Sequence, residues 1–203
     1  MPLLDLLRPV SDEELRLLSE RNPGWQFERL ADGRLAVSPT GGESGRISAA
    51  VLGQLYRWNE ARGLGVVFDA STGFKLPDGA VLSPDAAFLR GERWRALSPE
   101  EREGFPPLAP EAVFEVRSRS QSLEELREKG AWYLKNGVRL VVLLDLTPTG
   151  WRSSARGGWS ATGGRNGCLW TPSFPASSWK PGAFSSLDGG AWEPEHRAMR
   201  LPS

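Results

Sequence analysis

The stretch that decides the fold is residues 112–144, AVFEVRSRSQSLEELREKGAWYLKNGVRLVVLL. It begins with an apolar run at 112–116 and ends with another at 140–144, and each run has the length of a buried strand. Between the runs, Ser122 and Glu125 have the spacing of a capping box, which predicts the start of a helix. A strand, a helix and a strand at these lengths predict a right-handed crossover and a parallel pair of strands.

The residues near the N-terminus carry signals for a helix and a hairpin. A capping box that begins at Ser11 predicts a short N-terminal helix. The pair Asp32-Gly33 separates two segments, 25–30 and 34–38, and Asp-Gly is a strong turn signal between strands. We therefore expect an N-terminal helix followed by a β-hairpin.

A long helix is expected over residues 43–62, because apolar residues recur at helical spacing and Gly63 can end the helix. Strands are expected at 65–70, 72–76 and 86–89. The charged and proline-rich segment 90–110 is typical of a long loop with one helical turn at most. Together these elements predict an α/β (α+β) body with a mixed β-sheet and helices packed on it.

Residues 147–203 differ from the rest, because the hydrophobic periodicity stops there. Gly, Ser, Arg and Trp dominate this segment, and it holds five of the nine tryptophans of the chain. We therefore divide the chain into a body, 1–146, and an irregular tail, 147–203. A disordered tail is one explanation, although tryptophan is unusual in such a tail. The other is a frameshift near Leu146, since codon degeneracy lets the shifted frame encode ordinary strands and turns.

The composition excludes several kinds of protein. The formal net charge is zero, so any nucleic-acid-binding surface must be local. Cys168 is the one cysteine, which rules out an internal disulfide and fits a reducing, cytoplasmic location. His196 is the one histidine, so a histidine dyad or a zinc site in the body is not expected. No signal peptide or membrane span is visible.

Two acids lie where apolar strands should run into the core. Asp85 comes directly before the strand at 86–89, and Glu115 lies inside the strand at 112–116. A carboxylate in such a place is costly unless it is paired, hydrogen-bonded or bound to a metal. Two acids on neighbouring strands would make an oxygen site suited to Mg²⁺ or Mn²⁺. The simpler alternative for Asp85 is a turn, because Pro-Asp is common in loops.

These acids belong to a series of short motifs. In chain order the motifs are Asp32-Gly33-Arg34-Leu35, Ser83-Pro84-Asp85, Glu115-Val116-x-Ser118, Glu128-Lys129, Tyr133, Gly137-Val138 and Leu144-Asp145. In this order and spacing the chain resembles, over about residues 25–145, a compact bacterial family of putative restriction endonucleases in the PD-(D/E)XK nuclease superfamily. The resemblance implies a restriction-endonuclease-like core in which a mixed sheet with flanking helices binds Mg²⁺ and acts on DNA.

The resemblance also implies roles for individual residues. Asp85 and Glu115 would hold the metal, and Glu28 matches an acid that often completes the site. Lys129 matches a helix lysine that can replace the lysine of the final motif. Arg117 occupies the usual position of that lysine, where the family commonly has an apolar residue. Because arginine does not usefully exchange a proton, we assign Lys129 as the catalytic cation and Arg117 as a phosphate contact.

Each of these roles has a structural alternative. Glu115 is also explained by a buried ion pair with Arg117. Lys129 is also explained as a solvated helix residue paired with Glu125 one turn earlier. Glu28, on a hairpin, is also explained as an exposed residue.

The leading interpretation is therefore a Mg²⁺- or Mn²⁺-dependent endodeoxyribonuclease, in which Asp85 and Glu115 hold the ion and Lys129 assists phosphodiester hydrolysis. A catalytically inactive nucleic-acid-binding or interaction module on the same fold is the alternative, favoured by the neutral charge and by Arg117. A broken gene product, missing the strands that cover a sheet edge, is a third reading. The oligomeric state stays open, with a homodimer as a candidate because many nucleases dimerise to cut two strands.

Overall fold

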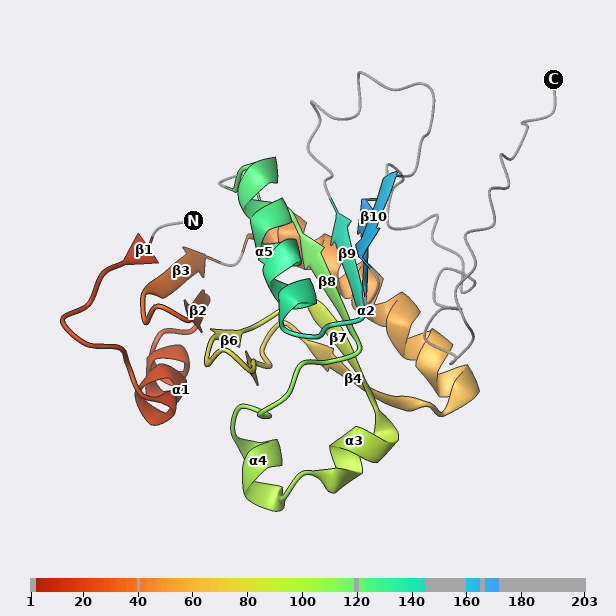
Figure 1. The fold of residues 1–203 in the computed structure, drawn as a ribbon, viewed down its shortest axis with the longest axis horizontal. Helices are drawn as coiled ribbons and strands as arrows, with labels where there is room; N and C mark the ends of the chain where they lie inside the picture. The colour runs from red at the N-terminus through yellow and green to blue at the C-terminus, as the bar shows by residue number, and fades with distance from the viewer. Residues whose placement is uncertain (1–2, 40, 119–120, 145–159, 165–166, 172–203) are drawn as a thin grey trace.

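The computed structural model describes residues 3–39, 41–118 and 121–144 in full, and 160–164 and 167–171 as backbone (Figure 1). Its strands form two sheets rather than one. The smaller sheet has the order β1 (Leu3–Leu4), β3 (Leu35–Pro39), β2 (Trp25–Arg29), β6 (Val81–Leu82) and β5 (Phe74–Lys75). The larger has the order β10 (Ser160–Gly164), β11 (Gly167–Thr171), β9 (Leu140–Leu144), β8 (Ala112–Val116), β7 (Ala86–Arg90) and β4 (Gly65–Asp69).

The crossover unit predicted from the sequence is present. Strands β8 and β9 pair in parallel, with Glu115 opposite Leu143, and helix α5 (Leu123–Lys135) connects them. The capping box closes as expected, because the hydroxyl of Ser122 accepts from the backbone N–H of Glu125 and the Glu125 carboxylate accepts from the N–H of Ser122. The larger sheet is mixed, since β8 and β9 are parallel while β7 pairs antiparallel with both β8 and β4.

The N-terminal helix and hairpin are also confirmed. Helix α1 (Asp12–Arg21) starts at a complete capping box with Ser11 as its N-cap. Strands β2 and β3 pair antiparallel, and the turn between them holds Gly33 at a φ of 85°. A Cβ at Gly33 would lie 2.5 Å from the Cγ of Pro9, so both the turn and the close approach require glycine here. The sequence did not indicate that this hairpin belongs to a second sheet.

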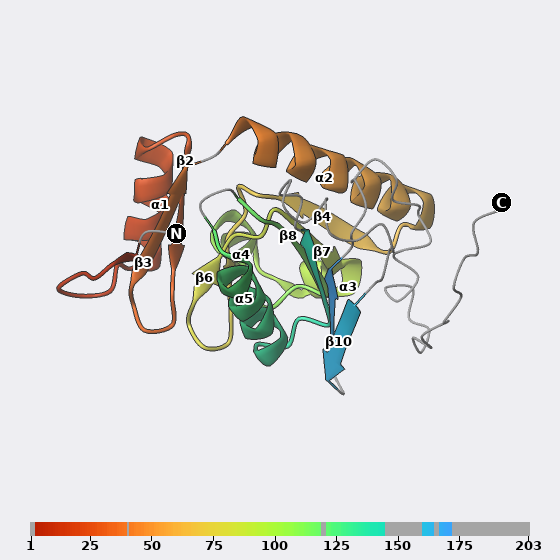
Figure 2. The same cartoon turned by 90° about the horizontal axis from the view of Figure 1, so that it is seen from above.

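Two helices cover opposite faces of the larger sheet (Figure 2). Helix α2 (Gly42–Arg62) ends at Gly63 as predicted and packs on one face. Helix α5 packs on the other face. The faces alternate along β8: Ala112, Phe114 and Val116 lie with α2, and Val113 lies with α5. The same alternation puts Glu115 on the α5 face.

The segment 90–110 is more ordered than the sequence predicted. It contains two short helices, α3 (Gly91–Ala96) and α4 (Pro99–Glu103), where a loop with at most one helical turn was expected. The second has a complete capping box from Ser98 to Glu101, with proline in the first turn. This signal was readable in the sequence, but the surrounding charges and prolines hid it.

Two segments of the tail, in which the sequence showed no regular periodicity, form strands. Strands β10 and β11 form an antiparallel hairpin, and β11 pairs in parallel with β9. The larger sheet therefore takes strands from both sides of residue 146. The proposed point of the frameshift, near Leu146, and His196 fall on residues outside those described. Within the described part of the chain, no helix is long and apolar enough to cross a membrane.

Candidate active site

Four residues predicted for the site lie close together, although they come from separate parts of the fold. They are Glu28 in β2, Asp85 just before β7, Glu115 in β8 and Lys129 in α5. The Nζ atom of Lys129 lies 3.0 Å from Oε1 of Glu28 and 2.8 Å from Oε1 of Glu115. The side chains of Lys129, Glu28 and Glu115 are 13%, 4% and 7% exposed. An ammonium group between two carboxylates compensates much of the cost of burying their charges.

Glu115 is a buried acid with two partners on α5. The hydroxyl of Tyr133 donates to Oε1 of Glu115 at 2.8 Å, and the ammonium of Lys129 contacts the same oxygen. Burial raises the pKa of Glu115 to about 7; Lys129 opposes this shift, and the neighbouring charges of Asp85 and Glu28 add to it. A buried ion pair was one alternative for this residue, and it exists, but the cation is Lys129 instead of Arg117.

Asp85 joins the cluster through hydrogen bonds from two other elements. Its Oδ2 accepts from the backbone N–H of Val116 at 2.7 Å, and its Oδ1 lies 2.8 Å from the hydroxyl of Ser48 on α2. Burial raises the pKa of Asp85 although both hydrogen bonds favour its charged form. Since Val116 follows Glu115, the two acids approach each other across the β7–β8 pair. The side chain of Asp85 thus contacts β8 and α2 and is more than a local turn residue.

Lys129 remains charged in this environment. Burial alone would lower its pKa, but the carboxylates of Glu115 and Glu28 raise the pKa above its usual range. A lysine with a raised pKa acts as a fixed positive charge and does not serve as a proton acceptor near neutral pH. The alternative of a solvated lysine paired with Glu125 is wrong, because Lys129 is nearly buried and its carboxylate partners are Glu28 and Glu115.

Glu28 is also buried, so the alternative of an exposed hairpin residue is wrong. It is 3% exposed, and its Oε1 accepts from the backbone N–H of Ser83 at 2.7 Å. The side chain of Gln26, on the same strand, donates to the carbonyl of Ser83 at 2.8 Å. These two hydrogen bonds connect β2 with the segment that carries Asp85. They hold the small sheet next to the acids of the large sheet.

Arg117 follows β8 and lies at the entrance to α5. Its backbone N–H donates to the carbonyl of Leu144, and its Nε donates to the carbonyl of Gln121 at 2.9 Å. The side chain is partly exposed. The guanidinium is therefore held by the backbone of Gln121, just before α5.

The clustered side chains are of the chemical type that binds a hard divalent metal ion. Glu28, Asp85 and Glu115 supply carboxylate oxygens, which Mg²⁺ and Mn²⁺ prefer. Tyr133, Lys129 and the N–H of Ser83 all bind Oε1 atoms, so none of these contacts uses Oε2 of either glutamate. Among the described residues, however, no three ligating side chains converge on one point. The Lys129 ammonium contacts carboxylate oxygens of both Glu28 and Glu115.

Three members of the cluster were missed by reasoning from the sequence. Tyr133 was named among the motifs but was given no role at the site; it is buried, and its hydroxyl contacts Glu115. Its place one turn after Lys129 was a readable signal, because residues four apart share a helix face. Ser48 and the backbone of Ser83 gave no such signal, since their contacts depend on how distant segments pack.

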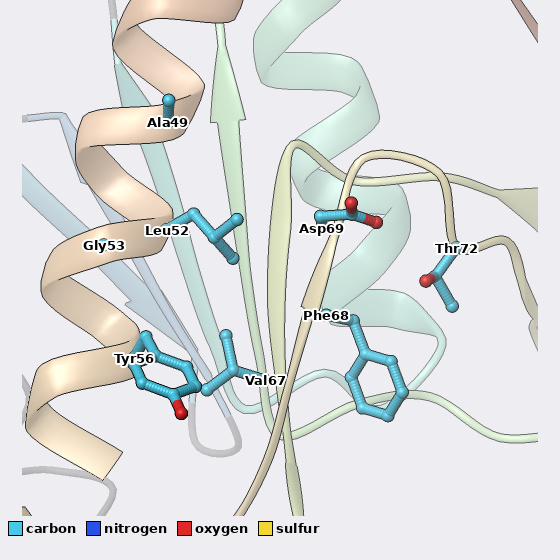
Figure 3. A pocket seen from close by; sticks show the side chains of 8 residues that line it. All are labelled: Ala49, Leu52, Gly53, Tyr56, Val67, Phe68, Asp69 and Thr72. Carbon is cyan, nitrogen blue, oxygen red and sulfur yellow. The ribbon is translucent and has the colours of Figure 1, made fainter. Parts of the chain in front are cut away.

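An open pocket of about 490 Å³ lies between α2 and β4 (Figure 3). Its walls are mostly apolar, with Leu52 and Tyr56 on α2 and Val67 on β4. None of the clustered acids lines it. The chemistry is therefore expected at the acids and not in this hollow.

Comparisons with known proteins concern the family and the fold of the chain. A crystal structure of a putative nuclease of the DUF820 group from Anabaena variabilis matches with a TM-score of 0.53 and 20% identity, over 68% of this chain and 74% of that one. At this identity the likeness concerns the fold. No curated protein matches the chain. The sequence profile of Uma2, described as a putative restriction endonuclease, matches residues 12–155. That match covers more than half of the chain and includes every clustered residue, and the protein therefore belongs to the Uma2 family of putative restriction endonucleases.

Proposed function

We propose that this protein is a metal-dependent phosphodiesterase that cuts DNA, with Mg²⁺ or Mn²⁺ as its cofactor. The observation that carries the proposal is that the Lys129 ammonium lies within 3.0 Å of the carboxylates of both Glu28 and Glu115. The three residues come from three different elements, and Asp85 lies next to them. Burying acids together with a lysine is costly unless each charge is compensated, which makes the cluster a candidate for a functional site. Membership of a family described as restriction endonucleases supports phosphodiester chemistry over other metal-dependent reactions.

Asp85 and Glu115 are the proposed metal ligands, with Glu28 as a further acid beside them. A bound ion would polarise the phosphoryl group and lower the pKa of a bound water. Lys129, which stays protonated, would stabilise the negative charge that develops on the phosphate. Arg117, at the rim, would contact a neighbouring phosphate and orient the strand. Because burial raises the pKa values of Asp85 and Glu115, metal binding must release protons and should strengthen as pH rises.

DNA is proposed as the substrate because the family is described as one of putative restriction endonucleases. The zero net charge means that affinity must come from a few local phosphate contacts. A homodimer would place two such sites on one DNA duplex. Each site would then cut one of the two strands. A cytoplasmic location agrees with the single cysteine.

The test is cleavage of supercoiled plasmid with Mg²⁺ or Mn²⁺ by the wild type and by Asp85→Asn, Glu115→Gln and Glu111→Gln. Glu111 is a matched control, because it is another buried acid, 5% exposed, whose carboxylate binds Arg93 and the N–H of Arg90 away from the cluster. We expect activity that needs metal and is lost in the first two variants only. Equal activity in the wild type and all three variants would overturn the proposal.

The second candidate is a catalytically inactive module that binds nucleic acid or protein. It is favoured by the position of Lys129, whose ammonium already compensates Glu28 and Glu115 as a bound ion would. Calorimetric titration with Mn²⁺ separates the two. The enzyme predicts binding that Asp85→Asn weakens, and the inactive module predicts no binding that depends on Asp85.

A further inference from the structure

We propose that Tyr133 is a positioning residue, which orients the carboxylate of Glu115 for metal binding. This inference rests on the proposed function, since it concerns how one of the two proposed ligands is held. It adds a role for a residue whose aromatic ring alone would be explained by the hydrophobic core.

The first argument is the geometry of α5. Lys129 and Tyr133 are one turn apart on the same helix face, with the ammonium 5.9 Å from the centre of the Tyr133 ring. Both direct a donor to the same atom, Oε1 of Glu115, at 2.8 Å each. Two donors on one oxygen fix the rotation of the carboxylate, and they leave Oε2 outside these contacts.

The second argument is that Glu28 is held in the same way. Its Oε1 binds the N–H of Ser83 and the ammonium of Lys129, and again neither contact uses Oε2. Each glutamate thus has one neutral donor and the shared lysine on one oxygen. Both glutamates of the cluster are thus held in a fixed orientation, as a metal ligand commonly is by a second partner that sets its direction.

The third argument is the position of the hydroxyl. Tyr133 is fully buried, so its O–H must find an acceptor inside the protein. Phenylalanine would fill the same space in the core without this requirement. The hydroxyl of Tyr133 is therefore explained by its hydrogen bond to the buried carboxylate of Glu115, which it orients.

The test is Mn²⁺ binding by calorimetry at pH 8 for the wild type, Tyr133→Phe and Tyr56→Phe. Tyr133→Phe removes the hydroxyl and keeps the ring. Tyr56→Phe is the matched control, because Tyr56 is 57% exposed. Loss of an orienting partner typically weakens metal affinity by about ten- to a hundredfold. We expect a loss of that size in Tyr133→Phe, with the metal concentration needed for half-maximal cleavage raised by a similar factor, and no change in Tyr56→Phe.

The possible results of this experiment distinguish failure of the Tyr133 inference from failure of the proposed function. If the wild type binds Mn²⁺ and Tyr133→Phe binds it equally well or more tightly, the positioning role is overturned and the proposed function stands. A melting temperature that falls in Tyr133→Phe with unchanged Mn²⁺ affinity has the same meaning, because it shows a structural role alone. If the wild type binds no Mn²⁺, the proposed metal site and the inference both fail.

Discussion

Glu28 and Lys129 are 101 positions apart in the chain, and yet the Lys129 ammonium donates to the Glu28 carboxylate at 3.0 Å. Glu28 belongs to the small sheet, while Lys129 belongs to the helix that covers the large one. The acid cluster is therefore complete only when the two sheets are packed together. This dependence of the site on tertiary packing leads to the first prediction.

Glu28→Gln should lower both stability and cleavage. The variant keeps an acceptor for the N–H of Ser83 but removes one of the two negative charges that compensate Lys129. We expect the free energy of unfolding to fall by roughly 1–3 kcal/mol, the usual cost of leaving a buried polar group incompletely satisfied. Urea denaturation measures this. Glu20→Gln, which removes a carboxylate from an exposed ion pair, is the control and should change little. A loss no larger than that of the control would contradict the role of Glu28.

The stability of the metal-free protein should depend on pH through Glu115. The pKa of this residue is raised from 4.5 to about 7 in the folded protein, so folding favours its protonated form. Its contribution is therefore fully present below about pH 4.5 and is lost as pH rises through 7. We expect Glu115→Gln to flatten this part of the profile, measured as unfolding free energy from pH 4.5 to 8. Glu111→Gln serves as the control. An identical slope in wild type and Glu115→Gln would show that Glu115 does not titrate as the structure implies.

Lys129→Met should separate metal binding from catalysis. The Lys129 ammonium neutralises the carboxylates that a metal ion would bind, so its removal should tighten Mn²⁺ binding at pH 8 while cleavage is lost. The rise in melting temperature on adding Mn²⁺ should accordingly be larger in the variant than in the wild type. Lys135→Met, at an exposed position on the same helix, is the control. Weaker metal binding in Lys129→Met would mean that the lysine supports the ion instead of competing with it.

Arg117→Ala should weaken DNA binding more than the chemical step. Arg117 directly follows strand β8, which carries Glu115, and its Nε donates to the carbonyl of Gln121. Loss of one phosphate contact should reduce the salt dependence of DNA affinity by about one unit in the slope of log K against log salt. Binding to a metal-free oligonucleotide duplex at several salt concentrations measures this. An unchanged slope would remove Arg117 from the DNA interface.

Local signals were enough to predict most of the fold. The capping boxes at Ser11 and Ser122, the Asp32-Gly33 turn and the end of α2 at Gly63 each depend on residues a few positions apart, and all four are confirmed. The division into two sheets could not be predicted, because it depends on strands as short as β5 and β6, which have two residues each.

For the candidate site, the sequence identified which residues to examine, but it did not reveal their partners. Glu115 and Asp85 stood out because acids are costly within apolar strands. The pairing of Lys129 with Glu28, and the bond from Ser48 to Asp85, join residues far apart in the chain and follow from packing alone. The role of Lys129 also needed the structure, because only its two carboxylate neighbours show that its pKa is raised and not lowered.

The most direct test of the central claim is a crystal of the protein soaked in Mn²⁺, with the ion located by anomalous diffraction. We expect a peak about 2 Å from carboxylate oxygens of both Asp85 and Glu115, with the Lys129 ammonium moved away from Glu115. A crystal without such a peak, in which Lys129 still joins Glu28 to Glu115, would contradict the proposed metal site.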